Sequence, residues 1–352
     1  MNPYTIPSLS WFNRTHEPHE VVVSTRVRLS RNVAGYPFPG MLGTRVQQEL
    51  VERIVSAWSH YLPGTRWVDL KSLPATAKKQ LIESQVLTRQ DLMAFPGGSL
   101  LLSPDTDPLG LVCFSDHLRL VRYDPGYNVQ QGMDSVRQLA EKLDEKLPFA
   151  FSLELGYLNA NVQDVGTGYR VSLLLHTPAT FAERAVVMLK KLLSEHDAVF
   201  LPFQSGRDLY SQGMFLLMMD GVQGLPPEKV RKRLEDTCTM VIHYEREKRE
   251  TLLSSRTRRE EVRERIDTAW KILTSSRKVS SKAASEALLL LRTAAVWGVG
   301  PRMDLGCFPY LYFASQPGHM RSRMEVEGVS LSREGEEEAR AAWLREMLSD
   351  HG

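Results

Sequence analysis

The fold prediction starts from the stretch Ser24-Thr25-Arg26-Val27-Arg28-Leu29-Ser30-Arg31, which has the pattern of a β-strand with two unlike faces. Alternate side chains of a strand share a face, so Arg26 and Arg28 lie together while Val27 and Leu29 point into a core. Two guanidinium groups held side by side repel each other unless an anion lies between them, and phosphate oxygens match their forked donors. The pattern therefore predicts an anion-binding strand or, equally, a solvated strand face paired with nearby acids.

A second predicted strand follows the run Asp116-His117-Leu118-Arg119-Leu120 and repeats this alternation. His117 and Arg119 are two residues apart, so we expect them on one face, with the leucines on the other. Arg119 is then a further candidate phosphate ligand. His117 by itself says less, because a single histidine is more often structural than functional.

The third stretch is Asp164-Val165-Gly166-Thr167-Gly168-Tyr169-Arg170, a glycine-rich turn that leads into another predicted strand. Glycines let a backbone approach a ligand closely, and successive N–H groups can form a nest for an anion. The turn is neither a Walker loop nor a dinucleotide fingerprint, because it lacks lysine and the order of strand and helix is wrong. Most such turns are only turns, so the signal is the set of four arginines that the three stretches supply: Arg26, Arg28, Arg119 and Arg170.

The composition describes a globular chain of 352 residues with room for two cores, since 42% of the residues are hydrophobic. The net charge is +2, which gives no general reason to expect nucleic acid or an anionic membrane as a partner. No apolar run is long enough to span a bilayer, and Met1–Arg14 lacks the pattern of a secretory signal. The cysteines, Cys113, Cys238 and Cys307, are far apart, so we expect no zinc site and a reduced, cytoplasmic protein.

Strands and helices are mixed in the first two-thirds of the chain, and the remainder is predicted to be almost purely helical. Short apolar and β-branched runs predict strands at Val21–Arg28, Leu109–Ser115, Leu118–Tyr123, Tyr169–His176, Ala198–Phe203 and Met214–Met219. Apolar spacings of three and four predict helices at Gln47–Trp58, Val129–Leu147 and Ala179–His196, and several more after Pro226. We therefore predict a mixed domain over residues 1–250 and an α-helical domain over residues 251–352, whose apolar stripes suit a core and equally a homodimer face.

These motifs resemble those of the ATP:guanido phosphotransferases, a family that includes creatine and arginine kinases and the bacterial protein-arginine kinases. The likeness is greatest to the bacterial branch and extends over nearly the whole chain. The matching stretches are Val23–Asn32, Tyr36-Pro37-Phe38-Pro39, Asp116-His117-Leu118-Arg119, Leu155-Gly156-Tyr157-Leu158, Val165–Arg170, Ser315-Gln316-Pro317 and Arg340–Glu346.

The resemblance implies an α+β fold, in which an antiparallel sheet flanked by helices forms a catalytic domain and an α-helical domain follows. It also implies that arginines bind ATP, with Mg carried by the nucleotide. The residues at the corresponding positions are Arg26, Arg28, Arg119 and Arg170, with Ser24 and His117 beside them. In the bacterial branch the substrate is an arginine side chain of a protein, and a small zinc-binding activator protein is a frequent partner.

Four positions depart from the family pattern where the chemistry is done. The second Glu of the family's Asn-Glu-Glu run is Ser115 here, within Cys113-Phe114-Ser115. The Glu of a later Arg-Gly-x-x-Gly-Glu loop is Arg207, and the arginine that opens this loop is Pro202. The family's cysteine at the substrate edge is Asn161. None of the family's catalytic positions is therefore intact.

These losses remove the groups that a guanidinium needs before it can attack a phosphate. Its pKa lies above about 12, so anions must hold the cation and accept its proton. Ser115 is neutral and Arg207 is positive, and losing a positioned base alone lowers a rate by about 10²–10⁴. Substitute carboxylates would have to come from Asp116, Asp164 or Glu154, and nothing in the sequence shows any of them in position.

The sequence therefore predicts a nucleotide-binding pseudokinase that acts by binding a regulatory or substrate protein. The alternative is an active protein-arginine kinase with a rewired site. A third hypothesis is a polyanion binder that uses the basic run Arg246–Arg265. Interleaved glutamates favour a self-paired solvated helix over this hypothesis.

The predicted helical domain also departs from the bacterial branch. The family's Arg-Asp-x-x-Arg-Ala motif, which recognises phosphoarginine, is Glu336-Glu337-Glu338-Ala339-Arg340-Ala341 here. Glu336 would repel a phosphate where an arginine should attract it. We therefore expect no phosphoarginine recognition at this position.

Overall fold

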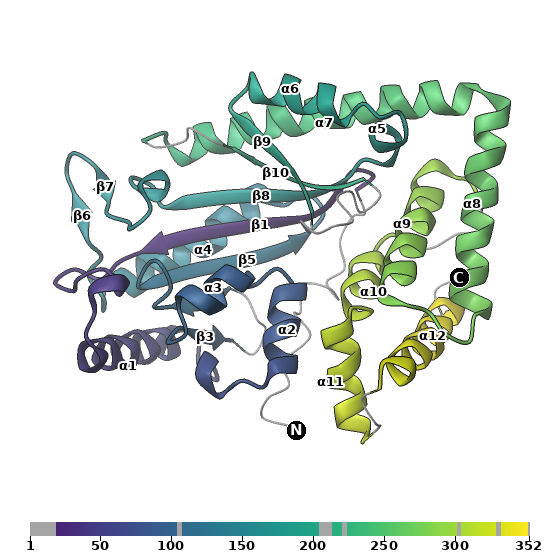
Figure 1. Cartoon of the computed structure of the whole chain (residues 1–352). Coiled ribbons are helices and arrows are strands. Elements are labelled where there is room, and N and C mark those ends of the chain that lie inside the picture. The colour runs from purple at the N-terminus through teal and green to yellow at the C-terminus, as the bar shows by residue number, and fades with distance from the viewer. Residues whose placement is uncertain are drawn as a thin grey trace.

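Eight antiparallel strands form one sheet, which the computed structural model places at the centre of the molecule (Figure 1). The structure describes residues 19–103, 108–203, 213–219, 224–300, 304–328 and 332–350. The order of strands across the sheet is β2-β3-β4-β5-β1-β8-β10-β9. Their bounds are β1 Val22–Arg31, β2 Arg66–Asp69, β3 Ser99–Leu102, β4 Leu109–Val112, β5 Leu118–Pro125, β8 Tyr169–His176, β9 Ala198–Pro202 and β10 Met214–Met219.

Helices surround the sheet, and a small hairpin of β6 Phe151–Ser152 and β7 Gly156–Tyr157 projects beyond it (Figure 1). The helices that precede the last strand are α1 Thr44–Tyr61, α2 Ala75–Glu83, α3 Arg89–Ala94, α4 Val129–Asp144, α5 Pro178–Ala182 and α6 Val186–Ser194. The later helices are α7 Pro227–Ser254, α8 Arg256–Ser275, α9 Ser281–Trp297, α10 Phe308–Ala314, α11 Pro317–Glu327 and α12 Arg333–Asp350.

The predicted α+β fold is confirmed, with an antiparallel sheet, flanking helices and a helical C-terminal part. Several predicted ends are displaced by a few residues, and two elements differ for a clear backbone reason. The strand expected over Leu109–Ser115 ends at Val112, because Cys113 has a φ of 55° and turns the chain. The single helix expected over Ala179–His196 is two helices, because Arg184 has a φ of 56° and interrupts it. The predicted domain boundary at residue 250 falls inside α7.

One face of the sheet packs against α1, α4, α6 and α7 through a buried apolar cluster. Val27 and Leu29 of β1 belong to this cluster, as their alternation with the arginines predicts. α4 approaches β1 closely at Gly132, where a Cβ atom would lie 2.7 Å from Val27 Cγ2. This contact fixes the side of β1 that faces the core and so fixes the side that carries Arg26 and Arg28.

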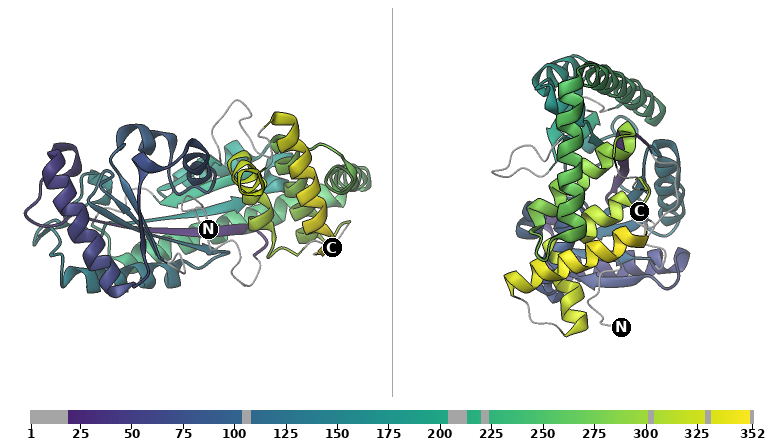
Figure 2. Two further views of the ribbon diagram at one scale, coloured as in Figure 1. Left: turned by 90° about the horizontal axis from the view of Figure 1, so that it is seen from below. Right: turned by 90° about the vertical axis from the view of Figure 1, so that its right-hand side faces the viewer.

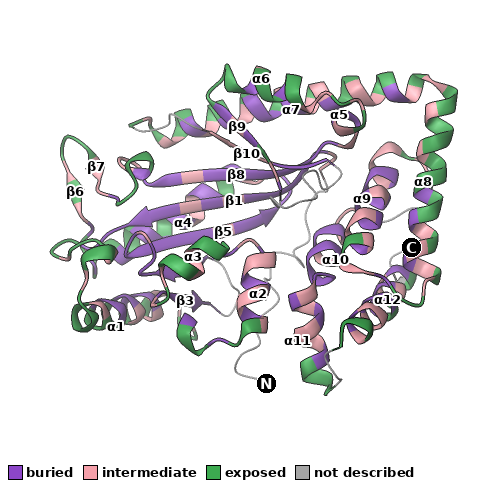
Figure 3. Ribbon diagram, in the orientation of Figure 1, coloured by how far each residue is buried: buried purple, intermediate pink, exposed green. Residues whose placement is uncertain are grey.

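The other face of the sheet packs against α2 and against the C-terminal helices, which gather at one end of the sheet (Figure 2). One continuous apolar cluster joins them, with Leu111 and Val121 from the sheet and Leu288 and Phe313 from α9 and α10. The strands β1, β5 and β8 are mostly buried, while α7 and α8 expose one side to solvent (Figure 3). Within the described ranges, no helix is both long and apolar enough to cross a membrane.

Arg340 of α12 is fully buried and ties three segments of the helical part together. Its Nε donates to the carbonyl of Ser315 at 2.7 Å and its Nη1 to that of Val279 at 3.0 Å. Its Nη2 donates to Glu336, which also accepts from Arg321 Nε at 2.8 Å. Burial would raise the pKa of Glu336, but the bonds from Arg340 and Arg321 outweigh it and lower that pKa. Glu336 therefore serves as the internal counter-ion of two arginines.

We expect Arg340→Ala to lower the free energy of unfolding by about 3–5 kcal/mol, because it leaves two buried carbonyls without a donor and Glu336 without its buried partner. Urea denaturation followed by circular dichroism measures this loss. Arg333→Ala is the matched control on the same helix, since its side chain is 89% exposed. We expect the control to change stability by less than about 0.5 kcal/mol. Equal effects of the two variants would contradict the structural role of Arg340.

Glu83 at the end of α2 caps the N-terminus of α11 and so links the sheet domain to the helical part. Its two oxygens accept from Gly318 N at 2.8 and 3.0 Å. The helix dipole favours a negative charge here. Burial outweighs this and the N–H bonds, and it raises the pKa of Glu83 from 4.5 to about 7. The carboxyl is therefore held more strongly in its protonated form in the folded protein than in the unfolded chain.

The raised pKa of Glu83 makes the stability of the folded protein depend on pH. The contribution of protonated Glu83 to stability is complete below about pH 4.5 and is lost as the pH rises through about 7. Relative to the wild type, Glu83→Gln should therefore become more stable as the pH rises over this interval, by up to about 3 kcal/mol. Melting temperatures of the wild type and Glu83→Gln, measured across this pH interval, test the prediction. The control is Glu325→Gln, because Glu325 makes an exposed contact with Thr76 between the same two helices. A constant difference between Glu83→Gln and the wild type would contradict it.

Candidate functional site

Three neighbouring strands bring the four predicted arginines together on one face of the sheet, which we call the arginine face. β1 lies between β5 and β8, and Arg28 of β1 is directly opposite Arg170 of β8. On β5, Arg119 is paired with the β1 residue two positions after Arg28. Arg26 precedes Arg28 by two residues and shares its face. Opposite side chains of an antiparallel pair have Cβ atoms about 5 Å apart, so the register gathers these guanidinium groups into one patch.

The arginine face holds polar donors that the described part of the chain does not satisfy. The side chains of Arg28, Arg119 and Arg170 are 15%, 10% and 32% exposed. The Nε atoms of Arg26, Arg28 and Arg119 are buried and have no hydrogen-bond partner within the described part of the chain. A buried donor without an acceptor costs about 1–3 kcal/mol, and more when it is charged. These donors are therefore arranged for acceptors that come from outside the described residues.

Charge crowding on the arginine face also disfavours the ionised form of two arginines. Burial, followed by repulsion from Arg119 and Arg26, lowers the pKa of Arg28 to about 9, although Asp164 opposes this. Burial lowers the pKa of Arg119 as well, against the attraction of Asp116. A bound anion would offset both effects, because an opposite charge within a few ångströms favours the ionised guanidinium. The unpaired donors and the lowered pKa values of Arg28 and Arg119 both favour a polyanion as the ligand.

Two carboxylates pair with these arginines. Asp164 lies between Arg28 and Arg170, with its oxygens 3.5 Å from Arg28 Nη2 and 2.9 Å from Arg170 Nη2. Asp116 lies 3.8 Å from Arg119 Nε and accepts hydrogen bonds from Asn32 Nδ2 at 2.8 Å and from a loop N–H. Both carboxylates are buried. Within the described residues, three of the four guanidinium groups therefore pair with these two carboxylates.

Ser115, which the resemblance aligns with a glutamate of the family, lies at the edge of the arginine face. Its Oγ donates to Asp116 at 3.0 Å and accepts from Arg119 Nη2. The left-handed turn at Cys113, whose N–H donates to the carbonyl of His117, places the residue there. A neutral hydroxyl thus occupies the position next to Arg119, and it cannot accept a proton as a carboxylate can.

The structure differs from the expectation that His117 lies beside Arg119 on one strand face. β5 begins at Leu118, so His117 belongs to the preceding loop. The ring is fully buried, its Nδ1 accepts from the N–H of Val33 at 2.9 Å, and its Nε2 lies 2.7 Å from the carbonyl of Pro37. Both ring nitrogens are therefore used by the backbone, and the histidine holds the β1 exit loop in place.

The glycine-rich turn serves close packing of the chain, which differs from the predicted anion nest. Gly166 N donates to the carbonyl of Tyr157, so this N–H is not available to a ligand. Gly168 has a φ of 73°, and a Cβ atom there would lie 2.5 Å from Arg31 Nη1. The turn thereby seats Arg31, whose guanidinium stacks over the ring of Tyr157 at 3.5 Å.

None of the other predicted positions that the structure describes pairs with one of the four arginines. Ser24 is buried further along β1, opposite Pro125 of β5. Asn161 is exposed, and its Oδ1 accepts from the N–H of Gln163 at 3.0 Å, which caps the short 3-10 turn Val162–Asp164. Pro202 ends β9 at the side of the sheet. Arg207 lies outside the described residues.

Tyr123 is a part of the arginine face that the sequence analysis did not single out. Its ring lies beneath Arg26, whose Cζ is 5.5 Å from the ring centre. Tyr123 is directly opposite Arg26 in the β1–β5 pair, and it lies on the same face of β5 as Arg119, which precedes it by four residues. This two-residue periodicity could have placed Tyr123 on the arginine face from the sequence alone.

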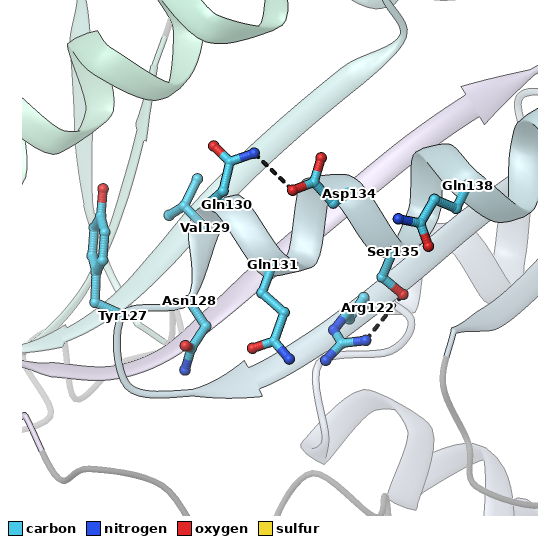
Figure 4. A pocket seen from close by; sticks show the side chains of 9 residues that line it. All are labelled: Arg122, Tyr127, Asn128, Val129, Gln130, Gln131, Asp134, Ser135 and Gln138. Carbon is cyan, nitrogen blue, oxygen red and sulfur yellow. Dashed lines mark hydrogen bonds between the residues drawn. The ribbon is translucent and has the colours of Figure 1, made fainter.

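A shallow hollow of about 660 Å³ lies along the exposed side of α4, away from the arginine face (Figure 4). It is lined mainly by amide and hydroxyl side chains, among them Asn128, Gln131 and Ser135. Arg122 is its basic residue, and this guanidinium donates to both oxygens of Asp124. The hollow therefore lacks the unpaired donors of the arginine face. Among the described residues, no group of three or more His, Cys, Asp or Glu side chains could hold a metal ion.

The comparison with known proteins agrees with this geometry. The family model described as "ATP:guanido phosphotransferase, C-terminal catalytic domain" matches residues 46–248. The chain is 26% identical over 346 residues to the protein-arginine kinase of Halothermothrix orenii, with 96% of each chain covered. It is 28% identical to the protein-arginine kinase of Syntrophomonas wolfei, with 97% of this chain and 95% of that protein covered.

Solved structures of guanido kinases share the fold. The duplicated taurocyamine kinase from Schistosoma mansoni superposes with a TM-score of 0.58 at 21% identity, covering 65% of this chain and 34% of that one. Lombricine kinase superposes with a TM-score of 0.55 at 17% identity, covering 65% and 67% of the two chains. The sheet, the arginine patch and the matched family model lead to one conclusion. The chain belongs to the ATP:guanido phosphotransferase family.

Proposed function

We propose that this protein binds Mg-ATP on the arginine face, no longer phosphorylates guanidinium groups, and acts through a protein partner. The observation that carries the proposal is the set of buried Nε donors of Arg26, Arg28 and Arg119, which have no hydrogen-bond partner among the residues that the structure describes. The triphosphate of ATP supplies several negative charges and many acceptor oxygens, and guanidinium forks match them. Magnesium carried by the nucleotide would neutralise part of the charge of the phosphates.

The proposed loss of phosphotransfer rests on what the nearby carboxylates already do. A guanidinium nucleophile must give up a proton to a positioned base. Asp164 pairs with Arg28 and Arg170, and Asp116 is held by several donors, including Ser115 Oγ. Neither carboxylate is therefore free to hold a second, incoming guanidinium.

The remaining candidate base, Glu154, is no better placed. It is exposed in the turn between β6 and β7, and its N–H is 3.2 Å from Ser152 Oγ. The hairpin projects beyond the sheet that carries the arginine face (Figure 1). Replacing a base by a residue that cannot accept the proton lowers a rate by about 10²–10⁴. The competing hypothesis is that the protein is an active protein-arginine kinase with a rewired site. A measurement of ATP turnover distinguishes this hypothesis from the proposed function.

Isothermal titration calorimetry with Mg-ATP should detect binding to the wild type at millimolar nucleotide or below. The double variant Arg26→Ala, Arg170→Ala should lose at least about 100-fold in affinity, because each charged hydrogen bond contributes about 1.5–3 kcal/mol. Arg137→Ala is the control, since this arginine is exposed on α4 and pairs with Asp134 and Glu141. Binding that survives in the double variant would contradict the assignment of the arginine face.

Phosphotransfer should be absent when the protein is incubated with Mg-ATP and an arginine-rich protein. The physical reason is that, of the candidate bases, Asp116 and Asp164 are engaged by other donors and Glu154 lies in the projecting hairpin. Mass spectrometry detects phosphoarginine, and release of ADP gives an independent rate. A protein-arginine kinase run in parallel serves as the positive control. Steady production of phosphoarginine by the wild type would refute the pseudokinase proposal and leave nucleotide binding intact.

A further inference from the structure

The Asp164 carboxylate lies inside the arginine face, in contact with the donors that a phosphate would use. It accepts from Arg170 Nε at 3.1 Å and lies 2.9 Å from Arg170 Nη2. Its other oxygen is 3.5 Å from Arg28 Nη2. Within the described residues, these two arginines supply every side-chain hydrogen bond that Asp164 accepts. The carboxylate thus has the surroundings of a bound anion.

Asp116 provides the contrast, because its bonds tie loops together. It accepts from Asn32 Nδ2 at 2.8 Å and from the N–H of Ala160 at 2.9 Å, as well as from the hydroxyl of Ser115. Its distance to the nearest nitrogen of Arg119 is 3.8 Å, which is an ion pair without a hydrogen bond. Asp116 would keep these structural partners in the absence of the arginine, whereas Asp164 would lose all of its side-chain partners.

The backbone around Asp164 holds the carboxylate in this place. The residue ends the 3-10 turn Val162–Asp164, and its N–H donates to the carbonyl of Asn161 at 2.9 Å. Its own carbonyl accepts from Asn159 Nδ2. The Asp164 side chain is only 1% exposed. Solvent therefore does little to screen its attraction to Arg28 and Arg170.

We propose that Asp164 is an internal anion that competes with nucleotide phosphates for Arg28 and Arg170 and so sets the affinity of the arginine face. The inference rests on the proposed function, because it concerns the same site. An incoming phosphate must take these donors from the carboxylate, which weakens binding. A movement of the turn that carries Asp164 would restore the full set of donors.

Asp164→Asn tests the inference, because it keeps the shape of the side chain and removes its charge. We expect the dissociation constant for Mg-ATP to fall roughly ten- to a hundredfold, as removal of one charge close to a phosphate implies. The same direction should hold for magnesium tripolyphosphate, which lacks the nucleoside. The melting temperature without ligand should fall, because Arg28 and Arg170 lose their counter-ion. The control is Asp134→Asn, which removes an exposed carboxylate from α4 and should leave the dissociation constant unchanged.

The outcomes separate the inference from the proposed function. If the wild type binds Mg-ATP and Asp164→Asn binds it equally or more weakly, the inference is overturned and the proposed function stands. If both proteins bind Mg-ATP and Asp164→Asn binds it more tightly, both are supported. If only Asp164→Asn binds it detectably, the inference is supported and the proposed function of the wild type is rejected. If neither protein binds, both are rejected.

A measurement on the wild type covers the case in which Asp164→Asn does not fold. Nitrogen-15 NMR follows the Arg170 Nε–H group, which donates to Asp164 in the ligand-free protein. We expect saturating Mg-ATP to shift this resonance, because its acceptor changes from carboxylate to phosphate. An unshifted resonance in a protein that has bound Mg-ATP would overturn the inference.

Discussion

The crowding of guanidinium groups on three adjacent strands is the constraint from which the rest of the site follows. β1 lies between β5 and β8, and the antiparallel register brings Arg28 opposite Arg170 with Arg26 and Arg119 nearby. Such a cluster is energetically unfavourable without anions. The pKa of Arg28 shows this, because burial and then the neighbouring arginines lower it to about 9. The apolar core behind β1 prevents the strand from turning its charged face away, because α4 packs against Val27 at Gly132.

The chain neutralises part of this charge with its own carboxylates, and the proposed loss of phosphotransfer rests on this pairing. Asp164 neutralises two of the arginines and Asp116 pairs loosely with a third. Neither carboxylate is then available as a base, and Ser115 offers only a hydroxyl. The helical part shows the same substitution, since Glu336 is the counter-ion of Arg340 and Arg321. In both places a single internal carboxylate is the counter-ion of two arginines.

The alternation of charged and apolar residues was enough to predict β1, its faces and the gathering of four arginines. Features that depend on contacts distant in sequence could not be predicted in this way. His117 alternates with Arg119, yet the ring is used by the backbone of the β1 exit loop. The helix expected over Ala179–His196 is broken by the positive φ of Arg184. The residue type gives no indication of this backbone conformation. The pairing of Asp164 depends on the 3-10 turn that Asn161 caps, and β2 and β3 are too short to give a clear alternating pattern.

The most direct test of the account is a crystal structure of the protein with magnesium and a non-hydrolysable ATP analogue. The account predicts phosphate oxygens within hydrogen-bond distance of the Nε atoms of Arg26, Arg28 and Arg119, with Asp164 displaced from Arg170 or repelled by the ligand. A nucleotide bound elsewhere, with these three Nε atoms still unpaired and the Asp164 contacts unchanged, would contradict the claim that the arginine face is an anion site.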